Sequence, residues 1–255
     1  KKGGYKGGAS SMSSQPAECQ SRCLAYLDSK KHLAVASNDG RVTIRNVDWS
    51  KVNSGDPAGL NTVLKTLFEK LAKPEWIEFM SYSPDEKYLG VGSHDNTIYL
   101  LEVATDYKKM HKLSRHSSFI TAFDWSQDSK YLRSVCGAYE LLFWNVDTKK
   151  QDPSGASNTR ETIWQSQSCK LGWAVQGIFP AGCDGSHVNT VSQNRKLNLI
   201  ATGDDWGQVN LYRYPVLEKS APPKPKKGQK KAKKSKEGGE HKAKIYMGHS
   251  EHVTT

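Results

Sequence analysis

Short hydrophobic runs that alternate with polar turns recur along most of the chain. The clearest unit spans residues 82–103, where the turn Ser83-Pro84-Asp85 precedes an apolar run at 88–91. A second turn, His94-Asp95-Asn96, precedes a run at 97–103 that is rich in β-branched and aromatic residues. Proline and aspartate favour turns, and such runs favour strands. The unit therefore predicts two antiparallel strands joined by a short turn.

The same succession of runs and turns occurs three more times. Residues 23–47 read CLAYL, HLAVAS and RVTIRNV, residues 119–146 read FITAFDWS, YLRSVCG and ELLFWNV, and residues 187–214 read HVNTVS, LNLIATG and QVNLYRY. The C-terminal sequence KIYMGHSEHVTT restarts the pattern. The shortest interval between corresponding turns, from Asp95 to Ala138, lies within the roughly 40–45 residues of a WD40 blade. The units therefore predict repeats of one β-sheet module.

Three segments interrupt the repeats. Residues 48–60 and 147–160 are rich in turn-forming residues and predict inserted loops, and residues 161–186 break the rhythm. The sequence LNTVLKTLFEKLAK, from Leu60 onwards, has apolar residues at the spacing of an amphipathic helix. The repeat, however, requires an outer strand before Trp76. Both interpretations remain open, and the frame of the repeat favours the strand.

The predicted fold class is all-β, a WD40-type β-propeller of about four blades plus the start of another. A four-stranded blade cannot bury both faces alone, so it must stack radially on its neighbours. Four units leave exposed strand edges, so we expect more blades to complete the ring. The expected domains are a flexible Gly/Lys/Ser segment at 1–16 and a partial propeller at 17–255, with a disordered Lys/Pro-rich insertion at 215–244.

The repeats are atypical for WD40 proteins. Trp144-Asn145 comes close to the Trp-Asp pair that usually ends a strand, and Gly248-His249 matches the Gly-His pair that precedes a blade. In regular repeats, His, Asp, Ser or Thr, and Trp side chains form a hydrogen-bonded network that makes the blade rigid. The sequence shows no blade with that full set.

Several sequences resemble a known family in their order along the chain. They are VGSHDNTIYLLEV, HSSFITAFDWSQDSKYL, GWAVQGIFPAGCDGSHVNTV, IATGDDWGQVNLYRYP and GHSEHVTT. Together they resemble the C-terminal propeller of the echinoderm microtubule-associated protein-like (EMAP) family, over residues 23–255. The resemblance implies a part of a larger tandem propeller and a protein that binds tubulin or microtubules. It also implies the cytoplasm and cytoskeleton, with the cilium or axoneme as a further location.

The positive charge of the chain is concentrated in one segment. The formal net charge is +11, and residues 219–244 hold 11 lysines against two glutamates. A segment of this composition favours polyanions through counter-ion release. The candidate residues for binding acidic tubulin tails are Lys224, Lys226, Lys227, Lys230, Lys231, Lys233, Lys234 and Lys236.

No catalytic motif is recognisable, so we expect a scaffold and not an enzyme, with no cofactor and no metal. His94-Asp95 is interpreted as a turn pair, and the spacings of Cys19 and Cys23 or of His249 and His252 do not specify a metal site. The expected partners are tubulin or microtubules and other microtubule-associated proteins, without a membrane. The alternative is a nuclear or ribonucleoprotein WD40 scaffold whose basic loop binds nucleic acid. Because aromatic residues are absent from the lysine run, nucleic acid is the less favoured partner.

Overall fold

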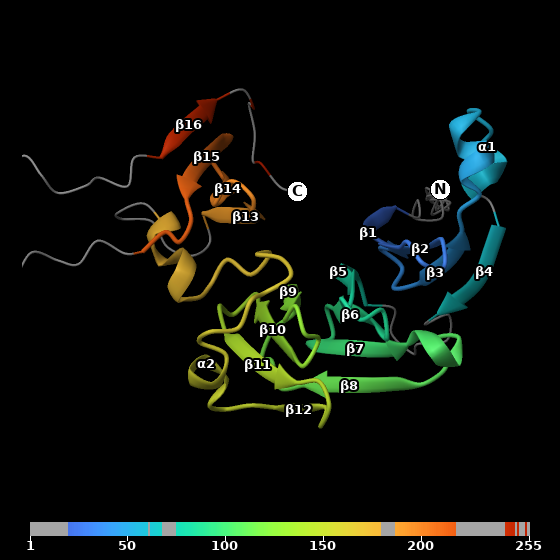
Figure 1. Cartoon of the computed structure of the whole chain (residues 1–255), viewed down its shortest axis with the longest axis horizontal. Helices are drawn as coiled ribbons and strands as arrows, with labels where there is room; N and C mark the ends of the chain where they lie inside the picture. The colour runs from blue at the N-terminus through green and yellow to red at the C-terminus, as the bar shows by residue number, and fades with distance from the viewer. Residues whose placement is uncertain are drawn as a thin grey trace, which may run out of the picture.

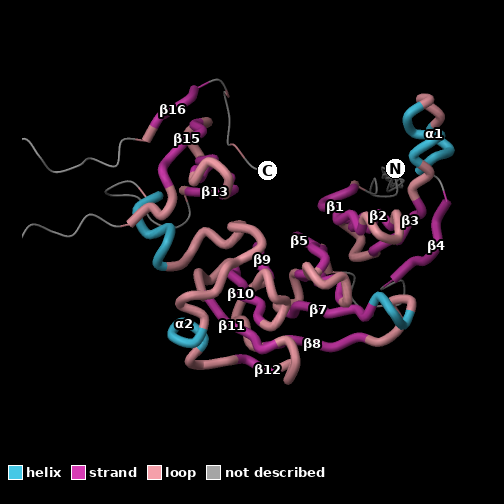
Figure 2. Tube along the Cα trace, in the orientation of Figure 1, coloured by secondary structure: helices cyan, strands magenta, loops and turns pink. Residues whose placement is uncertain are grey.

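The computed structural model describes residues 20–60, 62–67, 75–179, 187–217, 243–247, 249 and 253. These residues form four antiparallel sheets of four strands each, arranged as an open arc (Figure 1). Short helical segments lie only in the connections between strands (Figure 2). In the part of the chain that the structure describes, no helix is long and apolar enough to cross a membrane. The predicted all-β class is confirmed.

Each sheet is one blade, and its strands follow in sequence order from the inside of the arc to its outer edge (Figure 1). Blades 1 and 2 consist of β1 (Ser21–Leu27), β2 (His32–Ser37), β3 (Val42–Asn46), β4 (Thr62–Leu67), β5 (Ile77–Tyr82), β6 (Tyr88–Ser93), β7 (Thr97–Glu102) and β8 (Met110–Ser114). Blades 3 and 4 consist of β9 (Ile120–Trp125), β10 (Tyr131–Cys136), β11 (Leu141–Asn145), β12 (Lys150–Gln151), β13 (Val188–Asn194), β14 (Leu199–Asp204), β15 (Gln208–Arg213) and β16 (Lys244–Met247). The short helical segments are α1 (Trp49–Asn53), η1 (Pro57–Leu60), η2 (Val103–Thr105), α2 (Gly155–Asn158) and η3 (Trp173–Ile178).

The ambiguous segment after Leu60 forms a strand in its described part. Thr62–Leu67 is β4, which pairs antiparallel to β3, so the strand interpretation is confirmed for these residues. The inserted loop before it contains α1 and η1. Asp48 starts α1, because its side chain accepts a hydrogen bond from the Ser50 amide at 3.1 Å. The segment predicted as a loop therefore contains a short helix with an N-cap, which its composition did not indicate.

The interpretation of the C-terminal sequence was wrong in one respect. Its first residues, KIYM, form β16 and pair with β15, so they complete blade 4 and do not begin another repeat. Beyond them, the Val253 amide donates to the Asp204 carbonyl at 3.0 Å. The sequence suggested a restart because the apolar residues of KIYM follow directly on the end of the lysine run.

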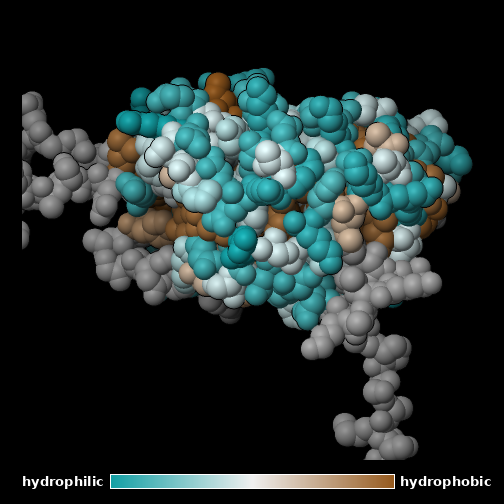
Figure 3. All heavy atoms as spheres, turned by 90° about the horizontal axis from the view of Figure 1, so that it is seen from below, coloured by the Kyte–Doolittle hydropathy of each residue, from teal (hydrophilic) through white to brown (hydrophobic). Residues whose placement is uncertain are grey.

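The turns between strands form two rims at opposite ends of the strands, which we call the upper and the lower rim and define by the turns that they carry. The upper rim carries the turns at 38–41, 94–96, 137–140 and 205–207, between the second and third strand of each blade. The lower rim carries the turns at 28–31, 83–87, 126–130 and 195–198, between the first and second strand. Seen from below in Figure 1, the outer edge of the arc is mainly hydrophilic, with scattered apolar patches (Figure 3).

Neighbouring blades pack face to face through small and large apolar residues. Blades 1 and 2 share one core cluster that includes Ala34, Ile44 and Leu89. Blades 2 and 3 share another, in which Phe123 and the neighbouring Trp125 lie against the backbone of β6. This close approach requires a glycine on β6, because a Cβ atom on Gly90 would lie 2.7 Å from the Phe123 ring.

We expect Gly90→Ala to destabilise the protein by roughly 1–3 kcal/mol, because the added methyl group overpacks the interface between blades 2 and 3. Equilibrium denaturation in urea measures the change. The double variant Gly90→Ala/Phe123→Leu should recover part of the loss, since the smaller side chain makes room. Additive losses in the double variant would contradict the steric explanation.

Blades 3 and 4 are joined by the segment that broke the sequence rhythm. Its described residues, 161–179, form no strand beyond an isolated bridge between Ser126 and Trp164. Val175 and Ile178 of η3 pack on the buried face of blade 4. The arc is open between blades 1 and 4 (Figure 1), so the completion of the ring by further blades stays a prediction.

Candidate functional site

The lysine run connects the two outer strands of blade 4. β15 ends at Arg213 and β16 begins at Lys244, so the connection starts and ends toward the lower rim. Its first residues are fixed: the Val216 amide donates to the Ala174 carbonyl, and the Gly177 amide donates to the Val216 carbonyl, both at 2.8 Å. The connection therefore leaves the fold from a rigid anchor on η3.

The eight candidate lysines, which lie between 224 and 236, fall outside the described residues. The same holds for the segment at 1–16 and for most of the insertion at 215–244. Their role in binding and the expected domain boundaries therefore remain predictions. What the structure does give is the place on blade 4 where the run is attached.

The lower rim of blade 4 is itself basic. Arg195, Lys196, Arg213 and Lys244 lie at this end of the blade, and Arg195 and Lys196 border an open hollow of about 610 Å³. The acidic residues of blade 4, among those that the structure describes, are Asp204 and Asp205 at the opposite rim. The cations of this rim were not singled out from the sequence, because they are single residues at strand ends.

Four lysines on the lower side of blades 1 and 2 have acidic partners, whereas no ion pair is found for the basic residues of the lower rim of blade 4 among the described residues. The ion pairs Lys31–Asp28, Lys65–Asp106, Lys87–Asp85 and Lys109–Glu102 have nitrogen–oxygen distances between 2.7 and 3.1 Å. Pairing neutralises these charges locally and leaves less field for an external polyanion. The positive potential of the lower rim is therefore expected to be highest at blade 4.

His94 and Asp95 do not form an acid–base pair. The Asp95 carboxylate accepts hydrogen bonds from the Thr97 amide at 3.1 Å and from the Tyr99 hydroxyl, which closes the turn between β6 and β7. His94 Nε2 instead lies 3.2 Å from a Glu78 carboxylate oxygen. The interpretation of both residues as turn residues is consistent with these contacts.

An aromatic cluster around His94 crosses the upper rim from blade 1 to blade 3. The His94 ring stacks on Phe119 at 4.6 Å between centroids and contacts Trp76 at 5.4 Å. Arg22 lies over the Trp76 ring at 4.8 Å and pairs with Glu78 at 3.0 Å. Trp76 and Phe119 remain more than one-third exposed. These contacts tie three blades together and leave aromatic surface accessible to solvent.

Blade 3 holds a hydrogen-bonded network that the sequence did not reveal. Trp144 Nε1 donates to Ser134 Oγ at 2.8 Å, and Ser134 Oγ lies 2.7 Å from His116 Nε2. His116 Nδ1 lies 3.3 Å from the Glu140 carboxylate. Glu140 thus takes the place of the usual aspartate. The sequence showed no complete set because the acid is two residues beyond Ala138, the position where an aspartate was sought.

A buried ion pair attaches the 161–179 segment to blade 3. The Asp124 carboxylate is fully buried and accepts hydrogen bonds from Arg133, from Ser166 Oγ at 2.7 Å and from the amides of Ser168 and Cys169 at 2.7 and 3.0 Å. Arg133 also donates to the Gln167 side chain at 2.7 Å. A buried charge is stabilised only when its partners satisfy it fully, as these do.

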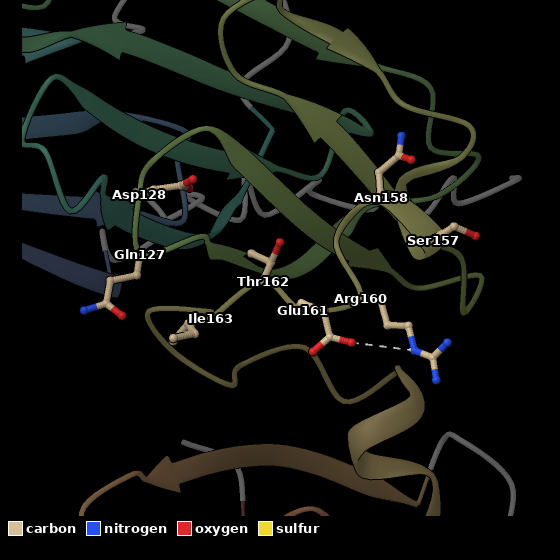
Figure 4. Close-up of a pocket in the computed structure, with 8 residues that line it drawn as sticks. All are labelled: Gln127, Asp128, Ser157, Asn158, Arg160, Glu161, Thr162 and Ile163. Atoms are coloured by element: carbon tan, nitrogen blue, oxygen red, sulfur yellow. Dashed lines mark ion pairs between the residues drawn. The ribbon is translucent and has the colours of Figure 1, made fainter.

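An open hollow near this segment does not have the composition of a catalytic site. It has a volume of about 690 Å³ and is shown in Figure 4. Its one ion pair, between Arg160 Nε and Glu161 Oε1 at 3.9 Å, is exposed to solvent. The lining residues are Gln127, Asp128, Ser157, Asn158, Arg160, Glu161, Thr162 and Ile163, which include neither a histidine nor a cysteine.

The four radially stacked sheets define the chain as a WD40-type β-propeller protein. The family model described as the second β-propeller of echinoderm microtubule-associated protein matches residues 8–255. The chain therefore belongs to the EMAP family, as the sequence resemblance indicated. The sequence GWAVQGIF, which is part of that resemblance, contains η3, the segment that joins blades 3 and 4.

Individual relatives match at substantial identity. The ciliary WD repeat-containing protein ctxp80 of Euplotoides octocarinatus is 48% identical over 85% of this chain and 28% of its own length. The 77 kDa echinoderm microtubule-associated protein of Strongylocentrotus purpuratus is 47% identical over 54% of this chain and 21% of its own length. Human echinoderm microtubule-associated protein-like 3 is 31% identical over 92% of this chain and 25% of its own length. The matched region is thus about a quarter of these relatives.

Proposed function

We propose that this chain is part of a microtubule-associated WD-repeat scaffold that binds tubulin. In this proposal, the lysine-rich connection between β15 and β16 tethers the acidic tails of tubulin beside the lower rim of blade 4. The observation that carries the proposal is the position of the connection. The connection starts and ends at the lower rim of blade 4. This part of the rim carries Arg195, Lys196 and Arg213, and the described residues of the blade include no acidic residue on the same rim.

Electrostatics supports this assignment of roles. Mobile acidic tails and a lysine-rich segment attract each other over about one Debye length, which is roughly 10 Å at 0.1 M salt. Such contacts raise the association rate and the salt dependence more than they raise specificity. The rigid blades would supply the specific surface, and the lysines would hold tubulin close to it.

The remaining functional assignments follow from membership of the family. The relatives described above include microtubule-associated and ciliary proteins. We infer that this protein acts at the cytoskeleton, in the cytoplasm or in a cilium or axoneme, with other microtubule-associated proteins as further partners. We further propose a scaffold role without catalysis, cofactor or nucleic acid, which is the role expected of a β-propeller of this family.

Removal of the acidic tubulin tails tests the proposal. Microtubules whose tails have been cleaved should retain less of the protein in co-sedimentation at low salt, because the polyanion that the lysines bind is gone. Equal binding to intact and cleaved microtubules would overturn the tether. Absence of binding to both, with nuclease-sensitive co-purification of nucleic acid, would overturn the scaffold and favour a ribonucleoprotein role.

A further inference from the structure

Three potential metal ligands meet at the upper rim of blade 3. His116 precedes β9, Cys136 ends β10 and Glu140 lies in the turn that leads to β11. One ligand atom from each residue lies within 4.8 Å of the other two. The Glu140 oxygen Oε2 is 3.3 Å from His116 Nδ1 and 3.2 Å from Cys136 Sγ. Side chains from three separate elements therefore converge on one point.

The spacing of these atoms fits a tetrahedral ion. Zinc bonds to nitrogen and oxygen at about 2.0–2.2 Å and to sulfur at about 2.3 Å, so neighbouring ligand atoms in a tetrahedral site lie roughly 3.3–3.6 Å apart. The two separations at Glu140 are at or just below the lower end of this range. The ligand atoms of the third pair, His116 and Cys136, lie within 4.8 Å of each other.

Hydrogen bonds hold the Glu140 carboxylate in position. The Ser117 amide donates to Glu140 Oε2 at 2.9 Å, and the Ser117 hydroxyl donates to Glu140 Oε1 at 2.8 Å. A carboxylate that is fixed in this way requires little reordering when it binds a cation.

The surroundings also orient the histidine. Ser134 Oγ contacts His116 Nε2 at 2.7 Å and is itself held by Trp144 Nε1. Metal-binding histidines usually have such a partner on the second ring nitrogen, because it fixes the ring and the tautomer. His116 and Cys136 are buried, whereas Glu140 is one-third exposed and opens the cluster to solvent.

We propose that His116, Cys136 and Glu140 form a binding site for one thiophilic divalent cation such as Zn²⁺, with a water molecule as the fourth ligand. On binding, the Cys136 S–H bond breaks, its proton passes to solvent and sulfur bonds to the metal. The neutral imidazole carries its hydrogen on Nε2, which donates a hydrogen bond to Ser134 Oγ, so the lone pair of Nδ1 is free to bind the metal. The thiolate and the carboxylate together balance the two charges of the cation.

A cation bound at this site would hold the turn before β11 against the segment before β9 more firmly than the hydrogen bonds do. The proposal does not depend on the proposed function, because the site lies on the rim opposite the lysine-rich connection. It also departs from the expectation that the chain has no metal. The three ligands are spread over residues 116–140 in no recognised metal motif, so only the folded blade brings them together.

Cobalt titration of the purified chain tests the proposal, because Co²⁺ substitutes for Zn²⁺ and a cobalt–thiolate bond absorbs in the near ultraviolet. We expect one Co²⁺ per chain, release of one proton, and loss of the band when Zn²⁺ is added. Cys136→Ser should abolish the band and weaken Zn²⁺ binding by about 100-fold or more. Cys23→Ser, which alters a cysteine on blade 1, should leave both unchanged and serves as the matched control.

A second variant keeps the test decisive if Cys136→Ser does not fold. Glu140→Gln preserves the shape of the side chain and should weaken Zn²⁺ binding by at least about 10-fold. Thermal denaturation without metal verifies that each variant is folded. No saturable band, or a band that survives Cys136→Ser, would overturn the proposal and leave the cluster as a hydrogen-bonded network only.

Discussion

Replacement of Asp124 by alanine should destabilise the protein by about 3–5 kcal/mol. The carboxylate is fully buried, and its loss leaves the Arg133 guanidinium without a counter-charge and the amides of Ser168 and Cys169 without acceptors. The largest part of the effect is the cost of the unpaired buried cation. Equilibrium denaturation in urea measures the change in the free energy of unfolding.

The loss should be accompanied by local release of the segment between blades 3 and 4. Amide hydrogen exchange at Ser168 and Cys169 is expected to accelerate more than exchange in β6, because the Asp124 oxygens accept from those two amides. Asp128→Ala is the matched control, since that carboxylate closes an exposed turn on the same blade through Ser126 and Lys130. A cost for Asp124→Ala no greater than for the control would contradict the role of the buried pair.

The second large effect concerns the lysine run. Replacing its eight candidate lysines by glutamine should weaken co-sedimentation with microtubules at low salt by about tenfold or more, because the polycation that attracts acidic tails is removed. The difference should shrink as the salt concentration rises, since the Debye length falls from roughly 10 Å at 0.1 M to about 3 Å at 1 M. The fraction of protein bound to microtubules, measured across a salt series, gives both the loss of binding at low salt and its dependence on salt.

A control with equal charge removal separates position from net charge. Lys226, Lys227, Lys230 and Lys231 are replaced by glutamine in one variant. In the other, the same change is made at the four ion-paired lysines Lys31, Lys65, Lys87 and Lys109. Only the first variant should lose binding. Equal losses would show that overall charge, and not the connection of blade 4, controls affinity.

The sequence predicted the blades well because their evidence is local. Period-two alternation such as Val42 and Ile44, and turns such as Ser83-Pro84-Asp85, mark each strand within a few residues. The strand at Thr62–Leu67 was favoured over a helix because of the repeat frame, and this was correct. The spacing of the apolar residues alone would have predicted a helix there, so tertiary pairing with β3 decided the outcome.

The remaining features depend on contacts between distant residues. Asp124 meets Ser166, Ser168 and Cys169 more than 40 positions along the chain, and nothing in the local pattern marks either end. Nothing in the local pattern indicates that Glu140 serves as the acid of the blade 3 network, because it is displaced from the usual position. The candidate lysines were found by composition, a signal that identifies charge but not where the charge lies in space.

The anchoring of the lysine-rich connection sets a limit on its range. The connection leaves from its anchor on η3 and returns to β16, the neighbour of β15, so both of its ends are attached at blade 4. A chain closed in this way cannot extend beyond half its contour length, which is roughly 40 Å for residues 218–242. A polyanion held by the lysines therefore remains within that radius of the lower rim. In the proposed function, the connection would restrict a bound tubulin tail to a small volume and so raise its effective concentration at the propeller.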